Sequence, residues 1–330
     1  MRVTLVSGSS RVSSQKRHSQ GNGQSQRMVA GVAVLLLVGG CAGGGPTGDP
    51  TEPPPGSAPG EPVVRVVAAG DISDCTPAEC VAADTAGVVT ELDPDLVLTL
   101  GDTQYESGTT AEYEAEYART WGRFLDITRP AVGNHEYETP GAQGYFDYFG
   151  SRAAPNTYGY YSFDAGAWHL VALNTNNACQ VVACDDGSEQ QQWFAADLAD
   201  TSRHCALAYM HHPRWSTGEH LDIEAVDALW RTAVEGGVDL VLAGHDHNYE
   251  RFVPLDADGA EDPAGAAQLV VGTGGTELRD FAEAPRAETA VRFADAHGVL
   301  ELELGRSSYS WRFVGTEGQV RDRGGPVDCG

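Results

Sequence analysis

Lysine is almost absent from this chain of 330 residues, whose single lysine is Lys16. The first forty residues also hold four arginines and no acidic residue. The remainder therefore carries 21 − 5 = 16 basic and 47 acidic side chains, a formal charge of 16 − 47 = −31. Proteins that bind nucleic acids present a basic face to the phosphate backbone. The charge thus argues against nucleic acid as a stable partner, and an anionic substrate needs local attraction, for example from a metal ion.

The most apolar stretch of the sequence, residues 28–40, is too short to cross a bilayer, which takes roughly 20 apolar residues. Its length is typical of the hydrophobic region of a signal peptide, and basic residues precede it. Residues 1–40 resemble a bacterial lipoprotein signal, in which Cys41 would carry the lipid; an ordinary cleaved secretory signal is the alternative. We therefore expect an exported protein, either a cell-surface lipoprotein that meets the membrane only through its lipid anchor or a secreted protein.

Residues 41–62 are rich in glycine and proline and show no apolar periodicity. Such a composition is typical of a tether between an anchor and a folded domain. No internal repeat is visible from residue 63 to the end of the chain, so we expect residues 63–330 to form a single domain.

The local CxxC pairs of most zinc sites are also missing, although the chain has seven cysteines. Six remain when Cys41 is set aside, and an even number in an exported chain favours disulfides over the alternative of a zinc site. The short loops "CTPAEC" and "CQVVAC" suggest two local bridges and leave one long-range bridge. The expected pairs are Cys75–Cys80, Cys179–Cys184 and Cys205–Cys329.

From residue 63 onward, apolar segments of strand type alternate with amphipathic segments of helix type. This alternation predicts an α/β domain with its helices outside. The antiparallel hairpin expected at 298–315 suggests a second sheet. The predicted strands are 63–71, 95–102, 129–136, 204–213, 239–247 and 267–275, with a hairpin at 160–176; the predicted helices are 77–92, 188–198, 222–237 and one containing Tyr113, Tyr117 and Trp121.

Five predicted strands end in residues that commonly bind metals. Functional residues of α/β sheets gather just past the carboxyl ends of the strands. Each residue alone more often marks a turn or packs in the interior, but five equivalent positions favour a metal site. Carboxylate, amide and imidazole donors suit divalent or trivalent transition metals, and a bridging Asp102 would let the set bind two. The residues are Asp71, Asp102, Asn134, His211 or His212, and His245 with His247.

The motifs around these residues resemble those of a known family. They are "GD" at 70–71, "GDTQY" at 101–105, "GNHE" at 133–136, "MHHP" at 210–213 and "GHDHNYER" at 244–251. This ordered set is similar to that of the calcineurin-like metallophosphoesterases, and most similar to that of the purple acid phosphatases. The resemblance implies a two-sheet β-sandwich flanked by helices. It also implies binuclear-metal-dependent hydrolysis of small-molecule phosphate monoesters by a metal-bound hydroxide.

The resemblance also assigns the metal ligands. The ligand in similar proteins is the histidine two positions before the proline, which selects His211 over His212. The first metal would be bound by Asp71, Tyr105 and His247, the second by Asn134, His211 and His245, and Asp102 would bridge them.

Two further histidines are candidate catalytic residues. His135 resembles the family histidine that contacts the phosphate or protonates the leaving group. His212 would point away from His211 in an extended segment, so substrate contact and simple packing are both open. His220 is expected in a surface loop, with substrate contact as the alternative.

Two charged residues are expected to support the site. Glu136 would orient a neighbouring ligand, and Arg251 would brace the histidine loop or form an ion pair with Glu250.

One histidine of the wider superfamily is missing. Many relatives have Asp-x-His at the first motif, whereas this chain has Ser73 in place of the histidine. In the purple acid phosphatase branch the tyrosine of GDxxY fills that position, which is Tyr105 here. The resemblance therefore implies Fe(III) bound to Tyr105, a coloured protein, and Fe, Zn or Mn as the second metal.

Two other functions remain open from the sequence. One is a phosphodiesterase or nucleotidase that uses the same site. The other is a non-catalytic surface lipoprotein that binds phosphate or a partner, for which the anchor and tether are equally suited.

Overall fold

A computed structural model describes residues 63–75, 80–153 and 158–330. The expected signal segment, the lipidation site Cys41 and the tether lie outside the described residues. Within these three ranges, no helix has both the length and the apolar character needed to cross a membrane.

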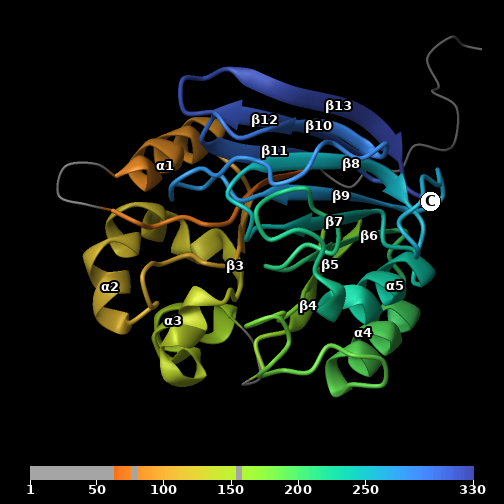
Figure 1. Ribbon diagram of the computed structural model, residues 1–330, viewed down its shortest axis with the longest axis horizontal. Coiled ribbons are helices and arrows are strands. Elements are labelled where there is room, and N and C mark those ends of the chain that lie inside the picture. Colours follow the sequence, from red (N-terminus) through yellow and green to blue (C-terminus); the bar gives the residue numbers. More distant parts are fainter. Residues whose placement is uncertain (1–62, 76–79, 154–157) are drawn as a thin grey trace, which may run out of the picture. The chain divides into compact units, whose positions relative to one another are not determined.

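The first of two sheets contains three parallel strands followed by three antiparallel ones (Figure 1). The late hairpin joins this sheet, because Val66 of β1 pairs with Leu302 of β11. A second sheet is present, as expected, but the late hairpin lies in the sheet of β1 and does not form that second sheet. The strand order is β13 (Val320–Asp328), β12 (Ser308–Gly315), β11 (Gly298–Leu304), β1 (Val64–Ala69), β2 (Leu96–Leu100) and β3 (Thr128–Ala131).

The second sheet is built from the middle of the chain. Its four central strands β9, β7, β6 and β5 run parallel, while β4, β8 and β10 are antiparallel to their neighbours. The expected hairpin at 160–176 forms β4 and β5. The strand order is β10 (Thr289–Phe293), β8 (Tyr249–Leu255), β9 (Ala266–Val271), β7 (Leu240–Ala243), β6 (Cys205–Tyr209), β5 (Trp168–Ala172) and β4 (Tyr161–Ala165).

Five helices surround the sheets in the described part of the chain (Figure 1). Helix α1 packs on β11 and β12, and α4 packs against α5. The helix expected around Tyr113, Tyr117 and Trp121 is the short α2, followed by two 3-10 turns at Tyr117–Arg119 and Trp121–Ile127. The helices are α1 (Val81–Leu92), α2 (Thr110–Ala115), α3 (Gln143–Phe149), α4 (Glu189–Asp200) and α5 (Asp227–Glu235).

Two apolar clusters hold these layers together. One contains residues of both sheets, such as Val66, Leu300 and Leu170. The other joins the second sheet to α4 and α5, through side chains such as Phe194 and Trp230. Strand β2 is buried along its whole length, which explains its uninterrupted apolar sequence. The resulting order, helices, sheet, sheet, helices, confirms the predicted two-sheet sandwich flanked by helices.

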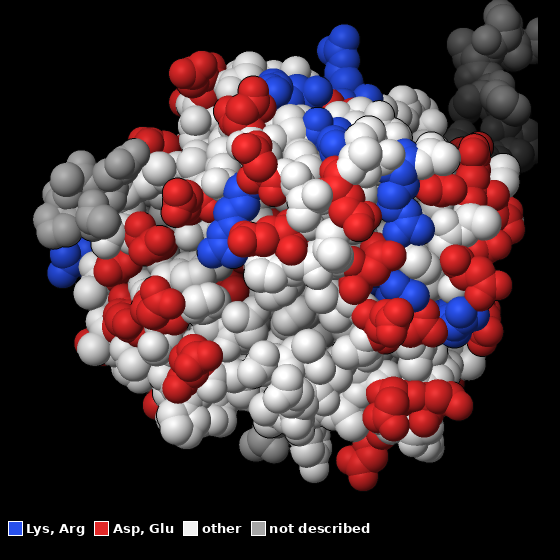
Figure 2. All heavy atoms as spheres, viewed as in Figure 1, with Lys and Arg blue, Asp and Glu red and all other residues white. Residues whose placement is uncertain are grey.

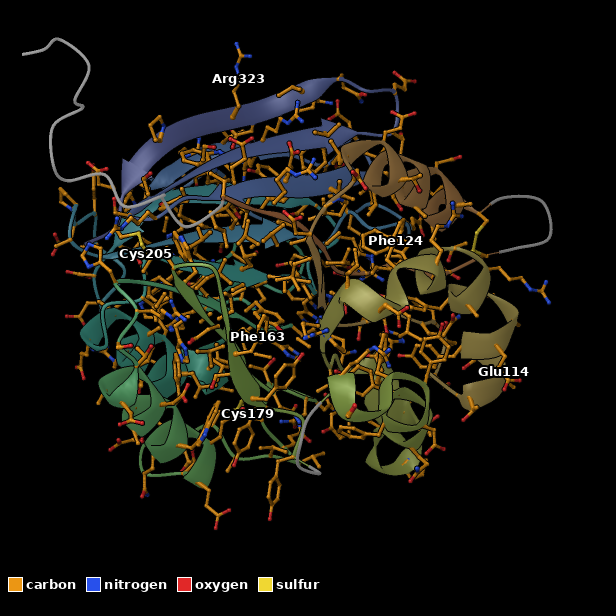
Figure 3. The ribbon with its side chains drawn as sticks, turned by 180° about the vertical axis from the view of Figure 1, so that it is seen from behind. Glu114, Phe124, Phe163, Cys179, Cys205 and Arg323 are labelled. Atoms are coloured by element: carbon orange, nitrogen blue, oxygen red, sulfur yellow. A yellow bond between two sulfur atoms is a disulfide. The ribbon has the colours of Figure 1, made fainter. Side chains whose placement is uncertain are left out.

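Three disulfides occur among the described residues. Cys75–Cys80 and Cys179–Cys184 close short loops, and Cys205–Cys329 joins residues 124 positions apart in the sequence. Figure 3 shows Cys205 at the beginning of β6, where the long-range bridge ties the end of the chain to the second sheet. The six thiols form bridges and are thus not zinc ligands.

Candidate metal centre

The candidate ligands follow strands of both sheets, namely β1, β2, β3, β6 and β7. Three of them have positive φ angles: 59° at Asp71, 45° at Asp102 and 72° at His245. L-amino acids rarely adopt this left-handed conformation, which costs about 1–2 kcal/mol per residue. Such strain is concentrated at functional sites, where surrounding contacts maintain it. The backbone thus turns sharply at the end of each of these strands and directs a donor group to one place.

Glycines beside the donors allow this close approach. A Cβ atom at Gly133 would lie 2.1 Å from Asp102 Oδ1, and one at Gly101 would lie 2.5 Å from His211 Nδ1. Any side chain at either position would displace a candidate ligand. These contacts give a physical reason for the glycines of the GN and GD motifs.

The first donor group surrounds the phenol of Tyr105. Its hydroxyl oxygen lies 3.0 Å from Asp71 Oδ1, 3.2 Å from His247 Nε2 and 3.3 Å from Asp102 Oδ2. His247 Nε2 is also 3.4 Å from Asp71 Oδ1. Four side chains from three separate segments thus converge with their donor atoms facing one another.

The second donor group surrounds His211. Its Nε2 atom lies 3.0 Å from Asn134 Oδ1, 3.1 Å from Asp102 Oδ2 and 3.2 Å from His245 Nδ1. The same oxygen, Asp102 Oδ2, therefore belongs to both groups. Its position is the one that a bridging carboxylate requires.

Backbone carbonyls orient two of the imidazoles. His211 Nδ1 lies 2.9 Å from the oxygen of Leu100, and His247 Nδ1 lies 2.8 Å from the oxygen of Glu277. A carbonyl oxygen only accepts, so Nδ1 carries the proton in both rings. The Nε2 atom of each ring is left facing the cluster, as in metal-bound histidines.

The charge distribution of the cluster fits a cation. Burial and the carboxylates of Asp71 and Asp102 raise the pKa of the Tyr105 phenol well above its usual value of 10. Burial alone would lower the pKa of His211, but Asp102 and Asp71 raise it to about 9. Burial alone would raise the pKa of Asp102, but the imidazoles of His211 and His135 lower it. The protein thus concentrates negative charge in a buried space whose oxygen and imidazole donors suit transition metals.

Glu136 holds the loop that carries Asp102. Its carboxylate is fully buried and accepts hydrogen bonds from the backbone N–H groups of Asp102 at 3.1 Å, Thr103 at 2.7 Å and Gly133 at 2.7 Å. Burial and the charge of Asp102 raise its pKa, although these hydrogen bonds oppose the shift. Glu136 is placed to position the ligand loops rather than to bind metal.

His135 lies beside the first donor group. The centre of its ring is 4.3 Å from that of Tyr105, and its backbone N–H donates to Asp102 Oδ1 at 2.8 Å. Its Nδ1 atom lies 2.6 Å from the backbone oxygen of Glu106. This contact fixes the ring and leaves Nε2 as the nitrogen that can face a substrate.

His212 also faces the cluster, which contradicts the expectation that it points away from His211. Its ring centre lies 4.3 Å from that of His245 and 4.9 Å from that of His211. The chain bends at residues 211 and 212 instead of continuing as a strand, so consecutive side chains do not alternate. Thr175 Oγ1 lies 3.0 Å from His212 Nδ1 and holds the ring in place.

Two further residues lie beside the centre. His220 is exposed in a loop, as expected, yet its ring stacks on that of His245 at 4.2 Å, and its backbone N–H donates to Asp246. Arg279 approaches the same ring, with Nη1 3.3 Å from His220 Nε2. The glycine-rich stretch 272–275 was the only sequence signal near Arg279.

Arg251 does not support the histidine loop as expected. Its guanidinium binds Asp322 of β13 at 2.6 and 3.1 Å and lies 4.8 Å from the ring centre of Trp311. Glu250 binds Thr217 instead of forming the expected ion pair with Arg251. Neighbouring residues of a strand point to opposite faces, which separates these two side chains.

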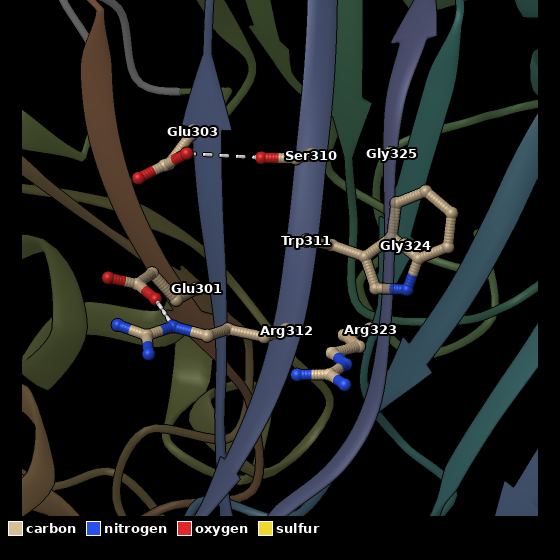
Figure 4. A pocket seen from close by; sticks show the side chains of 8 residues that line it. All are labelled: Glu301, Glu303, Ser310, Trp311, Arg312, Arg323, Gly324 and Gly325. Carbon is tan, nitrogen blue, oxygen red and sulfur yellow. Dashed lines mark hydrogen bonds and ion pairs between the residues drawn. The ribbon is translucent and has the colours of Figure 1, made fainter.

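A cavity of about 570 Å³ lies elsewhere, on the face of β11, β12 and β13 (Figure 4). Its polar groups are partly paired, since Arg312 binds Glu301 and Ser310 binds Glu303. None of its lining residues belongs to either donor group. The cavity is therefore separate from the candidate metal centre.

Comparison with known proteins gives consistent matches. The model of the calcineurin-like phosphoesterase family matches residues 64–249. Purple acid phosphatase 15 of Arabidopsis thaliana is 29% identical over 252 residues, which cover 65% of this chain and 44% of that protein. Purple acid phosphatase PPD1 of yellow lupin (Lupinus luteus) has a TM-score of 0.66 and 22% identity, over 80% of this chain and 53% of that chain.

A more distant structural neighbour is Plasmodium GAP50, described as the anchor in the inner membrane complex. Its TM-score is 0.61 at 13% identity, over 82% of this chain and 90% of that chain. At such identities a structural likeness shows the fold alone. The chain spans about half the length of the curated relatives it matches. The family match covers more than half of the chain and confirms the resemblance of the motifs: this protein belongs to the calcineurin-like phosphoesterase family of metallophosphoesterases, and its relatives include purple acid phosphatases.

Proposed function

We propose that the protein hydrolyses phosphate monoesters of small molecules with two metal ions, as a purple acid phosphatase does. The main support is the position of Asp102 Oδ2, which lies 3.1 Å from His211 Nε2 and 3.3 Å from the Tyr105 hydroxyl. A single oxygen between two convergent donor groups is what a binuclear centre needs. A carboxylate with a purely structural role would not need a group of metal-binding donors on each side of it.

The seven candidate ligands divide between the two metals. Asp71, Tyr105 and His247 would hold one ion, Asn134, His211 and His245 would hold the other, and Asp102 would contribute to both. Two metal ions in such a site activate water as a nucleophile and neutralise the phosphoryl oxygens. As in similar proteins, the phenolate of Tyr105 suits Fe(III), with Fe, Zn or Mn as the second ion.

The histidines around the ligands bind the substrate and donate a proton to the leaving group. His135 is fixed through Nδ1 by the carbonyl of Glu106, so in its protonated form Nε2–H donates to the leaving oxygen. His212 and His220 both lie against the ring of His245, at 4.3 and 4.2 Å between ring centres. They contact the phosphoryl oxygens and orient them, which favours the transition state.

We also propose that the protein is exported, either as a lipoprotein anchored at Cys41 or in secreted form. Three disulfides support this proposal because such bonds persist in oxidising compartments outside the cytosol. Globomycin blocks lipoprotein processing, so processing that is insensitive to globomycin would refute lipidation at Cys41.

Metal content and activity together test the proposed function. The purified protein should bind two metal ions per chain and hydrolyse monoesters such as p-nitrophenyl phosphate faster than the matching diesters. Asp102→Asn should lose both metal and activity, whereas Glu114→Gln, an exposed carboxylate on α2 (Figure 3), should lose neither. A protein that binds no metal after reconstitution, or an active Asp102→Asn variant, would refute the proposal. Faster cleavage of diesters than of monoesters would instead identify the protein as a phosphodiesterase.

A further inference from the structure

Arg279 brings a guanidinium group to the edge of the candidate metal centre. Its Nη1 atom lies 3.3 Å from His220 Nε2, and the ring of His220 stacks on that of His245. Only one imidazole therefore separates the positive charge from a candidate metal ligand. No step of the proposed function uses this charge.

The backbone of Arg279 is fixed relative to the centre. Its N–H donates to the carbonyl oxygen of His247 at 2.9 Å. The carbonyl of Glu277, two residues earlier, binds the imidazole of the same histidine at 2.8 Å. These two hydrogen bonds fix residues 277–279 against His247 and thereby fix the backbone position of Arg279. The side chain remains 40% exposed and accessible to a ligand.

The carboxylate that pairs with Arg279 is easily replaced. Glu219 Oε2 lies 3.2 Å from Nη1, and its side chain is 56% exposed. Exposed ion pairs contribute only about 0.2–1 kcal/mol. A guanidinium has five N–H donors in a planar fork that matches the oxygens of a phosphate group. An anion on the substrate can therefore displace Glu219 while the contact with His220 is retained.

The overall charge gives this arginine its importance. Beyond residue 40 the chain has no lysine and a formal charge of −31. Figure 2 shows acidic side chains scattered over much of the visible face. A substrate with several phosphates is repelled by such a surface unless a cation meets it locally. The two metal ions would meet the reacting phosphate, and Arg279 lies at the edge of that centre, one imidazole away from a candidate ligand.

We propose that Arg279 binds a second phosphate group, next to the one that reacts, and so favours polyphosphate esters such as nucleoside diphosphates. This inference rests on the proposed function. Water adds to the terminal phosphorus while its bond to the bridging oxygen breaks. The bridging oxygen takes up a proton, and inorganic phosphate and the shortened ester leave. Arg279 takes no part in these bond changes and acts by binding the group that remains.

The test compares ADP with AMP, which differ by one phosphate. Arg279→Gln should lower kcat/KM for ADP by about 10- to 100-fold, the range expected for a charged hydrogen bond, and change that for AMP by less than about twofold. Glu219→Gln removes the competing carboxylate and should raise kcat/KM for ADP only. Arg321→Gln is the matched control, because that arginine binds Asp295 on the loop before β11 and touches neither donor group.

Calorimetry separates this inference from the proposed function. In the metal-loaded protein, Arg279→Gln should weaken binding of pyrophosphate about tenfold and leave that of orthophosphate unchanged. A protein that hydrolyses no ester but keeps this difference would refute the proposed function and retain the second phosphate site. Equal losses for ADP and AMP, or an unchanged ratio of the two, would overturn the inference in favour of a bracing role for Arg279. Unchanged selectivity for pyrophosphate would overturn it as well.

Discussion

Replacing Glu136 with glutamine tests how the ligand loops are held. The Oε2 atom accepts from the N–H groups of Asp102 and Gly133, and Oε1 accepts from Thr103. In a glutamine, an NH₂ group replaces one of the two carboxylate oxygens, and this group cannot accept a hydrogen bond. At least one buried backbone N–H is therefore left without an acceptor. Each unpaired buried donor costs about 1–3 kcal/mol. If Oε1 is retained, two donors lose their acceptor, and the free energy of unfolding should fall by about 2–6 kcal/mol.

Urea unfolding of the metal-free protein, with its disulfides intact, measures this change. The same substitution at the exposed Glu303 of β11 is the control and should change the stability by less than about 0.5 kcal/mol. Because the loop also sets the backbone of Asp102, Glu136→Gln should bind metal more weakly than the unmodified protein. A variant with unchanged stability and unchanged metal affinity would show that Glu136 does not position the ligand loops.

Named contacts give three further predictions. Tyr105→Phe should abolish the visible absorption of the iron-loaded protein without changing its far-ultraviolet circular dichroism; a retained band would exclude the phenol as a ligand. Hydrogen bonds to Asp197 and Asp164 raise the pKa of His169, against the effect of burial. The protonated ring should therefore stabilise the fold fully at a pH below 6.5, the ordinary pKa of histidine. That stability should be lost as the pH rises through the raised pKa, and an unchanged pH slope in His169→Gln would contradict it. Replacing both cysteines of Cys205–Cys329 with serine should cost about 2–5 kcal/mol in urea unfolding, and a loss below about 1 kcal/mol would contradict a role in stability.

The strands that lead to the ligands were predictable because their signal is local. In β1, β2, β6 and β7, a short apolar run ends abruptly at a polar residue, and both the strand and the turn are visible within about ten residues. Helix α4 was likewise predictable from its N-cap, since Ser188 accepts a hydrogen bond from the N–H of Gln191.

Strands with polar sequences were missed for a physical reason. Strand β8 contains Glu250, Arg251 and Pro254, and its charged side chains are satisfied by Thr217 and Asp322, which lie far away in the sequence. Strand β13 contains the sequence Gly-Gly-Pro at 324–326, which indicates a turn, yet an edge strand tolerates it. Pairing of the late hairpin with β1 is also a long-range event that no local pattern encodes.

The residues around the ligands show the same limit. The bend that turns His212 toward His245 interrupts the alternation from which its direction was inferred. Arg279 is placed by hydrogen bonds between its own segment and His247, 32 positions earlier in the chain. Motifs therefore identify the ligands, whereas the surroundings that select a substrate depend on tertiary structure.

The shared oxygen of Asp102 has a thermodynamic consequence for metal loading. Two ions that use one carboxylate oxygen do not bind independently, because each changes the charge and position of the other's ligand. The free energy of this coupling is the same whichever ion binds first. In a chain that binds two ions as proposed, weakening either donor group therefore changes the occupancy of the other.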